Sequence, residues 1–169
     1  MARCLIIGCG CRGRSLAVEL IGRGHAVRGT TRDSARAVEI EGVGAEALVG
    51  DPNVVGTLAR ALDHVAVACV LLGSAKGTPA QLAVLHGSRL EMLLTRMVDT
   101  TVRGVVYETA GSVGSEVLEA GAARVRAHCQ DSRIPYVLLD ADPADPEAWT
   151  AAAVAAVELA LDGESGGPR

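Results

Sequence analysis

The stretch C-L-I-I-G-C-G-C-R-G-R-S-L-A-V-E-L, residues 4–20, decides the fold of this chain. An aliphatic run is followed by three glycines in the spacing G-x-G-x-x-G and then by apolar residues that repeat with helical period. A second aliphatic run, 26–30, arrives at the distance of a strand–helix–strand unit. In that context Gly8 makes the tight turn, Gly10 admits a pyrophosphate, and Gly13 lets the helix pack on the strand. We therefore expect a dinucleotide-binding turn, with phosphates on the free N–H groups of the helix N-terminus.

The rest of the chain alternates aliphatic runs with helical segments. Parallel strands need crossovers of a dozen or more residues, and such crossovers are right-handed. The predicted fold is therefore α/β, a doubly wound parallel Rossmann sheet of about six strands in the order 3-2-1-4-5-6. The expected strands are Arg3–Gly8, Ala26–Thr30, Ala45–Val49, His64–Leu72, Arg103–Thr109 and Pro135–Asp140. The expected helices are Ser15–Gly22, Ser34–Glu41, Val54–Leu62, Thr78–Leu85, Ser88–Val98, Ser115–Asp131 and Asp145–Leu161.

Helix start signals and domain limits follow from the same pattern. Thr78 with Gln81 and Ser88 with Glu91 are each typical of a capping box. We expect one NAD(P)-binding domain over residues 1–162 and a disordered, glycine-rich tail over 163–169.

Composition excludes several classes of function. The net charge of the 169 residues is −4 and no basic block is present, so we expect no nucleic-acid partner. No apolar run approaches the ~18 residues of a membrane span, and no signal peptide is recognisable, so we expect a cytoplasmic protein. The five cysteines form no C-x-x-C pair and have no His or Cys cluster at ligand spacing, so free thiols and no metal are expected.

The end of the second predicted strand decides between NAD and NADP. NAD-preferring sites place an Asp or Glu there to bind the ribose 2′-hydroxyl. This chain has Thr31 and Arg32, with Arg36 one helical turn further on and Arg12 in the glycine turn. Because arginine binds phosphate oxygens bidentately, these residues favour a 2′-phosphate. NADP is therefore the expected cofactor and NAD the alternative, and solvated surface arginines would also explain the pattern.

The chain resembles the short-chain dehydrogenase/reductase superfamily, in particular its NAD-dependent epimerase/dehydratase and NmrA-like branches. The resemblance rests on G-C-G-C-R-G (8–13), G-H-A-V-R-G-T-T-R-D (24–33), G-A-E-A-L-V-G-D-P (44–52) and R-G-V-V-Y-E-T-A-G-S-V-G (103–114). It implies that Asp51 lies near the adenine and that Thr109 takes part in catalysis, with Ser112 nearby. The cofactor-binding residues that we expect are Gly8, Gly10, Cys11, Arg12, Gly13, Thr31, Arg32, Arg36, Asp51, Pro52, Leu72, Gly73 and Ser74.

The chain departs from the family at its catalytic end. The family's Tyr-x-x-x-Lys is missing from the helix after the fifth strand, and the only lysine, Lys76, lies in the loop after the fourth strand. The substrate-binding region of extended members is also missing from this sequence. The polar groups expected at the nicotinamide end are Glu108, Thr109, Ser112, Arg124 and His128. We take Thr109 and Glu108 as catalytic candidates, although a Glu inside a strand is equally explained by internal hydrogen bonds.

Three hypotheses follow from these observations. The preferred one is a non-catalytic dinucleotide-binding or redox-sensing protein; the alternatives are a small NADP-dependent oxidoreductase with unconventional catalytic residues and a ligand-free Rossmann scaffold in an assembly. The resemblance implies a homodimer through the helices at 88–98 and 115–131. The first of these helices carries an apolar stripe that is wide enough to pack on the sheet and on a partner at the same time. The residues of this stripe are Leu90, Leu93, Leu94, Met97 and Val98.

Overall fold

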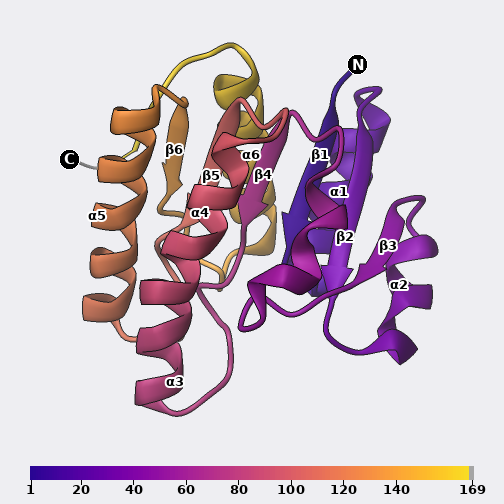
Figure 1. Cartoon of the computed structure of the whole chain (residues 1–169). Helices are drawn as coiled ribbons and strands as arrows, with labels where there is room; N and C mark the ends of the chain where they lie inside the picture. The colour runs from indigo at the N-terminus through magenta and orange to yellow at the C-terminus, as the bar shows by residue number, and fades with distance from the viewer. Residues whose placement is uncertain (168–169) are drawn as a thin grey trace.

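A six-stranded parallel sheet forms the centre of the computed structural model, which describes residues 1–167 (Figure 1). The strand order is β3-β2-β1-β4-β5-β6, so the predicted α/β Rossmann fold is confirmed. The strands are β1 (Arg3–Ile7), β2 (Ala26–Thr31), β3 (Glu46–Val49), β4 (Val67–Val70), β5 (Gly104–Glu108) and β6 (Tyr136–Leu139). The α-helices are α1 (Cys11–Gly22), α2 (Ala37–Glu41), α3 (Pro79–Val84), α4 (Leu90–Val98), α5 (Ser115–Ser132) and α6 (Pro146–Leu161).

Both faces of the sheet are covered by helices. Successive side chains of a strand point to opposite faces, so in β1 Cys4 and Ile6 join one buried cluster and Leu5 and Ile7 the other. The first cluster includes apolar residues of α1 and α6, and the second includes those of α4 and α5. Figure 1 shows α4 and α5 in front of the sheet and α6 behind it. This arrangement leaves the carboxyl ends of the strands as the place for a ligand.

The segment after β3 differs from the prediction. Instead of one helix over 54–62 it forms two 3-10 turns, Val55–Leu58 and Arg60–Leu62. The buried Arg28 of β2 donates hydrogen bonds to the carbonyl oxygens of Ala61 (2.8 Å) and Asp63 (2.9 Å). Arg28 thus supplies a partner to carbonyl oxygens at the end of the segment, where a helix would supply none.

Two helix starts were predicted after β4, of which one is confirmed and one is wrong. The capping box of α3 is confirmed, because Gln81 N donates to Thr78 Oγ1 (3.2 Å) and Thr78 N to Gln81 Oε1 (2.9 Å). The predicted box at Ser88 is wrong. Ser88 lies inside a π-helical turn, Leu85–Arg89, which joins α3 to α4 with a kink at Gly87.

The segment that follows α6 runs beside β6. Leu138 N donates to Gly166 O (2.9 Å), Gly166 N donates to Tyr136 O (3.1 Å), and Tyr136 N donates to Ser165 Oγ (3.1 Å). The predicted disordered tail covered residues 163–169. Within this range Ser165 and Gly166 have these partners, and residues 168–169 lie outside the described part of the chain. The disorder of the tail stays a prediction.

Candidate functional site

A cleft of about 460 Å³ opens at the carboxyl ends of β1, β2, β3 and β4. It lies where doubly wound sheets bind their ligands, at the point where the strand order reverses between β1 and β4. Of the thirteen residues predicted to bind a cofactor, all but Asp51 and Gly73 line this cleft. The predicted residues that line it are Gly8, Gly10, Cys11, Arg12, Gly13, Thr31, Arg32, Arg36, Pro52, Leu72 and Ser74.

The glycine turn forms the floor of the cleft at the N-terminus of α1. Gly8 has φ +82°, a conformation that side chains rarely adopt, and a Cβ there would lie 2.6 Å from Leu71 O. A Cβ on Gly13 would lie 3.1 Å from Ile6 Cγ2, so glycine allows α1 to pack closely on β1. Gly10 faces open space, and no side chain caps the helix. The first-turn N–H groups are therefore free to bind an anion.

Cationic side chains surround this floor. The cleft is lined by Arg12, Arg14, Arg32, Arg36 and Lys76, and no acidic residue among residues 1–167 lines it. Arg14 pairs with Glu39 (3.0 Å) and Arg12 with Glu108 (3.1 Å). The described part of the chain offers no acidic partner to the other three, so the cleft of this net-negative protein carries uncompensated positive charge.

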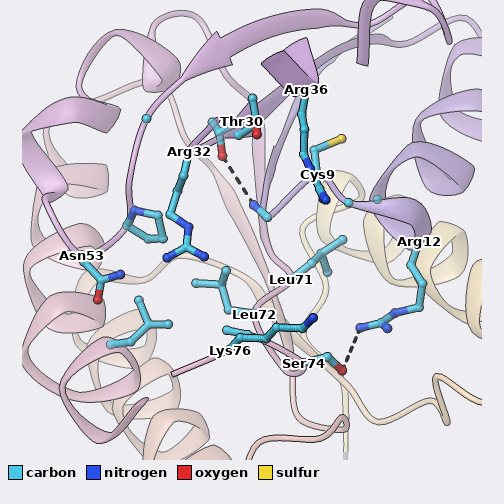
Figure 2. Close-up of a pocket in the computed structure, with 18 of the residues that line it drawn as sticks. Cys9, Arg12, Thr30, Arg32, Arg36, Asn53, Leu71, Leu72, Ser74 and Lys76 are labelled. Carbon is cyan, nitrogen blue, oxygen red and sulfur yellow. Dashed lines mark hydrogen bonds between the residues drawn. The ribbon is translucent and has the colours of Figure 1, made fainter. Parts of the chain in front are cut away.

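Figure 2 shows how these cations are divided. Arg32 and Arg36 come from the segment after β2, whereas Arg12 comes from the start of α1 and points toward Ser74. The structure thus keeps Arg32 and Arg36 as candidates for a 2′-phosphate and separates Arg12 from them. It also brings in Lys76 from the loop after β4.

The opposite wall is apolar apart from two amides. Pro52, Leu71, Leu72, Leu82 and Leu85 line it, together with Asn53 and Gln81. Asp51 is set back from the cleft: its Oδ1 accepts from Asn53 N (2.9 Å) and from Asn53 Nδ2 (3.1 Å). Asp51 therefore orients Asn53, and Asn53 presents its amide to the cleft.

Glu108 lies at the end of β5 and has no solvent exposure. Its Oε1 accepts from Gly73 N (2.8 Å), its Oε2 accepts from Trp149 Nε1 (2.9 Å), and both accept from Arg12 Nη2 (3.2 and 3.1 Å). The guanidinium of Arg12 also lies 5.2 Å from the centre of a Trp149 ring. Both oxygens of this carboxylate therefore accept hydrogen bonds from inside the protein. This supports the explanation of Glu108 by internal hydrogen bonds over a catalytic role.

The other predicted nicotinamide-end residues also lie away from the cleft. Thr109 Oγ1 donates to Leu139 O (3.2 Å) and lies 3.4 Å from Asp140 Oδ1. Arg124 pairs with Glu91 (3.6 Å), and His128 Nε2 is buried without a hydrogen-bond partner in the described chain. The structure therefore does not gather these residues with Glu108 into one site.

A buried His–Tyr pair lies behind the wall of the cleft. His86 Nδ1 is 2.7 Å from Tyr107 Oη, and its Nε2 is 3.1 Å from Leu72 O. Burial lowers the pKa of His86, against the opposing effect of the Leu72 hydrogen bond, and burial raises the pKa of Tyr107 far above its ordinary value. A Cβ on Gly121 would collide with Tyr107 Oη, so glycine is needed on α5 beside this pair.

Sequence reasoning missed part of the cleft. Asn53, Lys76, Gln81, Leu82 and Leu85 were not among the predicted site residues. Only the capping box of α3 could have drawn attention to Gln81, and it indicates a helix start rather than a ligand. Asn53 reaches the cleft from the segment after β3, and the other four come from the loop after β4, from α3 and from the turn that follows α3.

Comparisons with known proteins concern the fold. No protein-family model matches this sequence, and no curated protein is significantly similar to it. A short-chain dehydrogenase/reductase superfamily protein from Agrobacterium tumefaciens, solved with NAD, is 19% identical with a TM-score of 0.67; the match covers 80% of this chain and 48% of that one. Triphenylmethane reductase from Citrobacter sp., solved with NADP(H), is 19% identical with a TM-score of 0.64, over 81% of this chain and 48% of that one.

An epimerase shares the fold as well. UDP-glucose 4-epimerase from Thermotoga maritima, solved with UDP-glucose, is 14% identical with a TM-score of 0.68, over 80% of this chain and 54% of that one. This chain spans about half the length of each of the three structures. At this level of identity the three matches show that the chain shares their Rossmann fold.

Proposed function

We propose that this protein binds NADP(H) in the cleft at the carboxyl ends of β1–β4 and carries out no hydride transfer of its own. The observation that carries the proposal is the pair Arg32 and Arg36, which have no acidic partner among residues 1–167 and line the same cleft as the uncapped N-terminus of α1. Two phosphate-binding features at one cleft match the two anionic groups of NADP, its pyrophosphate and its 2′-phosphate.

The choice of NADP over NAD rests on the end of β2. An acidic residue at that position would accept a hydrogen bond from a 2′-hydroxyl and repel a 2′-phosphate. Here β2 ends at Thr31, and Arg32 follows it. Asp33 comes next, but its Oδ1 accepts from Ala35 N (2.9 Å) at the start of the next turn, and Asp33 does not line the cleft.

The absence of hydride transfer rests on the residues of α5 and β5. Helix α5, S-E-V-L-E-A-G-A-A-R-V-R-A-H-C-Q-D-S, contains neither tyrosine nor lysine. A proton donor must come within hydrogen-bond reach of the substrate oxygen. Glu108 is buried in internal contacts and Thr109 is bonded toward β6, so neither catalytic candidate reaches the cleft.

Calorimetric titration of the full chain with NADPH and NADH tests this proposal. We expect NADPH to bind more tightly than NADH by about tenfold or more, since charge-assisted hydrogen bonds to a phosphate contribute about 1.5–3 kcal/mol. Equal binding would remove the NADP preference. If neither cofactor binds, the remaining hypothesis is the ligand-free scaffold. If the protein oxidises NADPH in the presence of aldehydes, ketones or quinones, it is the NADP-dependent oxidoreductase of the alternative hypothesis.

The homodimer stays a prediction. Leu90, Leu93, Leu94 and Met97 of α4 are buried within the chain's own core, while Val98 is 46% exposed. Core packing thus accounts for most of the stripe, and a partner would bury mainly exposed residues of α4 and α5. Sedimentation that shows only a 17.3 kDa species at micromolar concentration would refute the dimer.

Among residues 1–167, no helix is both long and apolar enough to cross a membrane.

A further inference from the structure

The cleft covers only half of the surface that a dinucleotide uses on this fold. Each half of a doubly wound sheet binds one mononucleotide, so the adenosine half lies toward β2 and β3 and the nicotinamide half toward β5 and β6. The cleft is lined from the ends of β1 to β4 and from α3. Within residues 1–167, none of the residues 108–114 at the end of β5 and in the following loop lines it.

The loop after β5 packs directly on the loop after β4. Val113 N donates to Gly73 O (2.9 Å), and Ser112 N donates to Ser74 Oγ (3.3 Å). A Cβ on Gly73 would collide with Ala110 O, and a Cβ on Gly111 would collide with Gly73 O. The two backbones are in contact, so no space for a nicotinamide ring remains between them.

The side chains around Glu108 stabilise the contact between the loops after β4 and β5. Glu108 is completely buried and binds Gly73 N from the β4 side, Trp149 Nε1 from α6 and Arg12 from the glycine turn. Arg12 in turn lies 3.4 Å from Ser74 Oγ. Opening the loops would therefore break hydrogen bonds between this carboxylate and partners from three other segments, which opposes opening.

We infer that the cleft recognises the 2′-phosphorylated adenosine-diphosphate half of NADP(H) and leaves the nicotinamide in solvent. This inference rests on the proposed function. Since oxidation and reduction change only the nicotinamide, a site without contacts to that ring has the same affinity for NADP⁺ and NADPH. The protein then responds to the total amount of NADP(H) and not to its redox ratio.

Four ligands test the inference by calorimetry on the full chain: NADP⁺, NADPH, ADP-ribose 2′-phosphate, which lacks the nicotinamide, and ADP-ribose, which also lacks the 2′-phosphate. We expect the first three to bind with dissociation constants within about threefold of one another, because all three carry the same contacting groups. ADP-ribose should bind about tenfold more weakly or worse, since it lacks the group that Arg32 and Arg36 would bind.

Ligand-observed saturation-transfer NMR supplies an independent measurement on NADP⁺. We expect saturation of the adenine protons and little or none of the nicotinamide protons. Two results would overturn the inference and leave the proposed function standing. One is a difference of more than about threefold between the dissociation constants of NADP⁺ or NADPH and that of ADP-ribose 2′-phosphate. The other is strong saturation of the nicotinamide protons. Binding of none of the four ligands would overturn both.

Discussion

Arg12 and Glu108 lie 96 positions apart in the chain, and Arg12 Nη2 donates to both carboxylate oxygens of Glu108, at 3.2 and 3.1 Å. The first residue belongs to the turn that binds phosphates in this fold, and the second ends the strand next to β4. The pair therefore joins the two halves of the sheet at the switch point. It also occupies Arg12, which would otherwise be free to contact a ligand.

The ion pair of Arg12 and Glu108 should stabilise the fold. We expect Arg12→Met to lower the free energy of unfolding by about 3 kcal/mol, because it leaves a buried carboxylate without its counter-charge. Glu108→Gln should cost less, since the Arg12 side chain is 28% exposed and stays partly hydrated. The double variant should cost less than the sum of the two, as measured by urea denaturation.

Arg14→Met is the matched control for that experiment. Arg14 also lies on α1 and pairs with a glutamate, but this partner, Glu39 of α2, has a side chain that is 46% exposed. Its loss should therefore cost less than about 1 kcal/mol. Equal costs for Arg12→Met and Arg14→Met would contradict a stabilising role for the buried pair.

Arg32→Ala should remove the preference for NADPH. We expect the affinity for NADPH to fall about tenfold or more, as a charge-assisted contact to the 2′-phosphate is lost, and the affinity for NADH to change little. Arg23→Ala is the control, because Arg23 is an exposed arginine at the far end of α1 from the cleft. If both substitutions lowered NADPH binding equally, the effect would be one of overall charge.

Thiol labelling should report on the cleft. Cys11 is exposed and lines the cleft, whereas the other four cysteines are buried. Burial raises the pKa of Cys9 to about 11 and those of Cys4 and Cys129 to about 12, and it raises the pKa of Cys69 as well. Because the thiolate is the reactive form, we expect only Cys11 to react rapidly with a thiol reagent in the native protein.

Bound NADPH should slow that reaction, because it would cover the N-terminus of α1 where Cys11 lies. Cys11→Ser should remove the rapid phase, and in denaturant all five thiols of the unsubstituted protein should react. Rapid labelling that NADPH leaves unchanged would argue against a ligand at the glycine turn.

The stability of the protein should fall in mild acid because of His86. Burial lowers the pKa of this histidine in the folded state, so between that lowered value and the ordinary value of about 6.5 the unfolded chain binds the extra proton. Its contribution to stability is therefore complete above about pH 6.5 and is lost as the pH falls through this window. Urea midpoints measured between pH 8 and pH 5 will check this (roughly the range over which histidine titrates).

His86→Gln should be less stable at neutral pH and should depend less on pH within that window. His64→Asn is the control, because His64 is exposed and asparagine tolerates its φ of +61°. A pH dependence that survives in His86→Gln would have to come from another group.

The sequence alone determined the order of the sheet and the place of the glycine turn. The glycine turn follows from local requirements, since Gly8 needs a positive φ and Gly13 needs close contact with β1. The sheet order follows from the alternation of strands and helices, because that alternation requires right-handed crossovers and is typical of the doubly wound fold. The constraints on the glycine turn act between residues close in the chain, so their pattern is visible in the sequence. The same holds for the Thr78 capping box.

Only the tertiary structure decided what the cleft can hold. It turned Arg12 toward Glu108, set Asp51 behind Asn53, brought Lys76 and α3 to the wall, and closed the loops after β4 and β5 on each other. Each of these is a contact between segments that are separate in the chain or a choice between several hydrogen-bond partners. Side-chain identity permits such contacts, but only the packing of all the elements together selects among them.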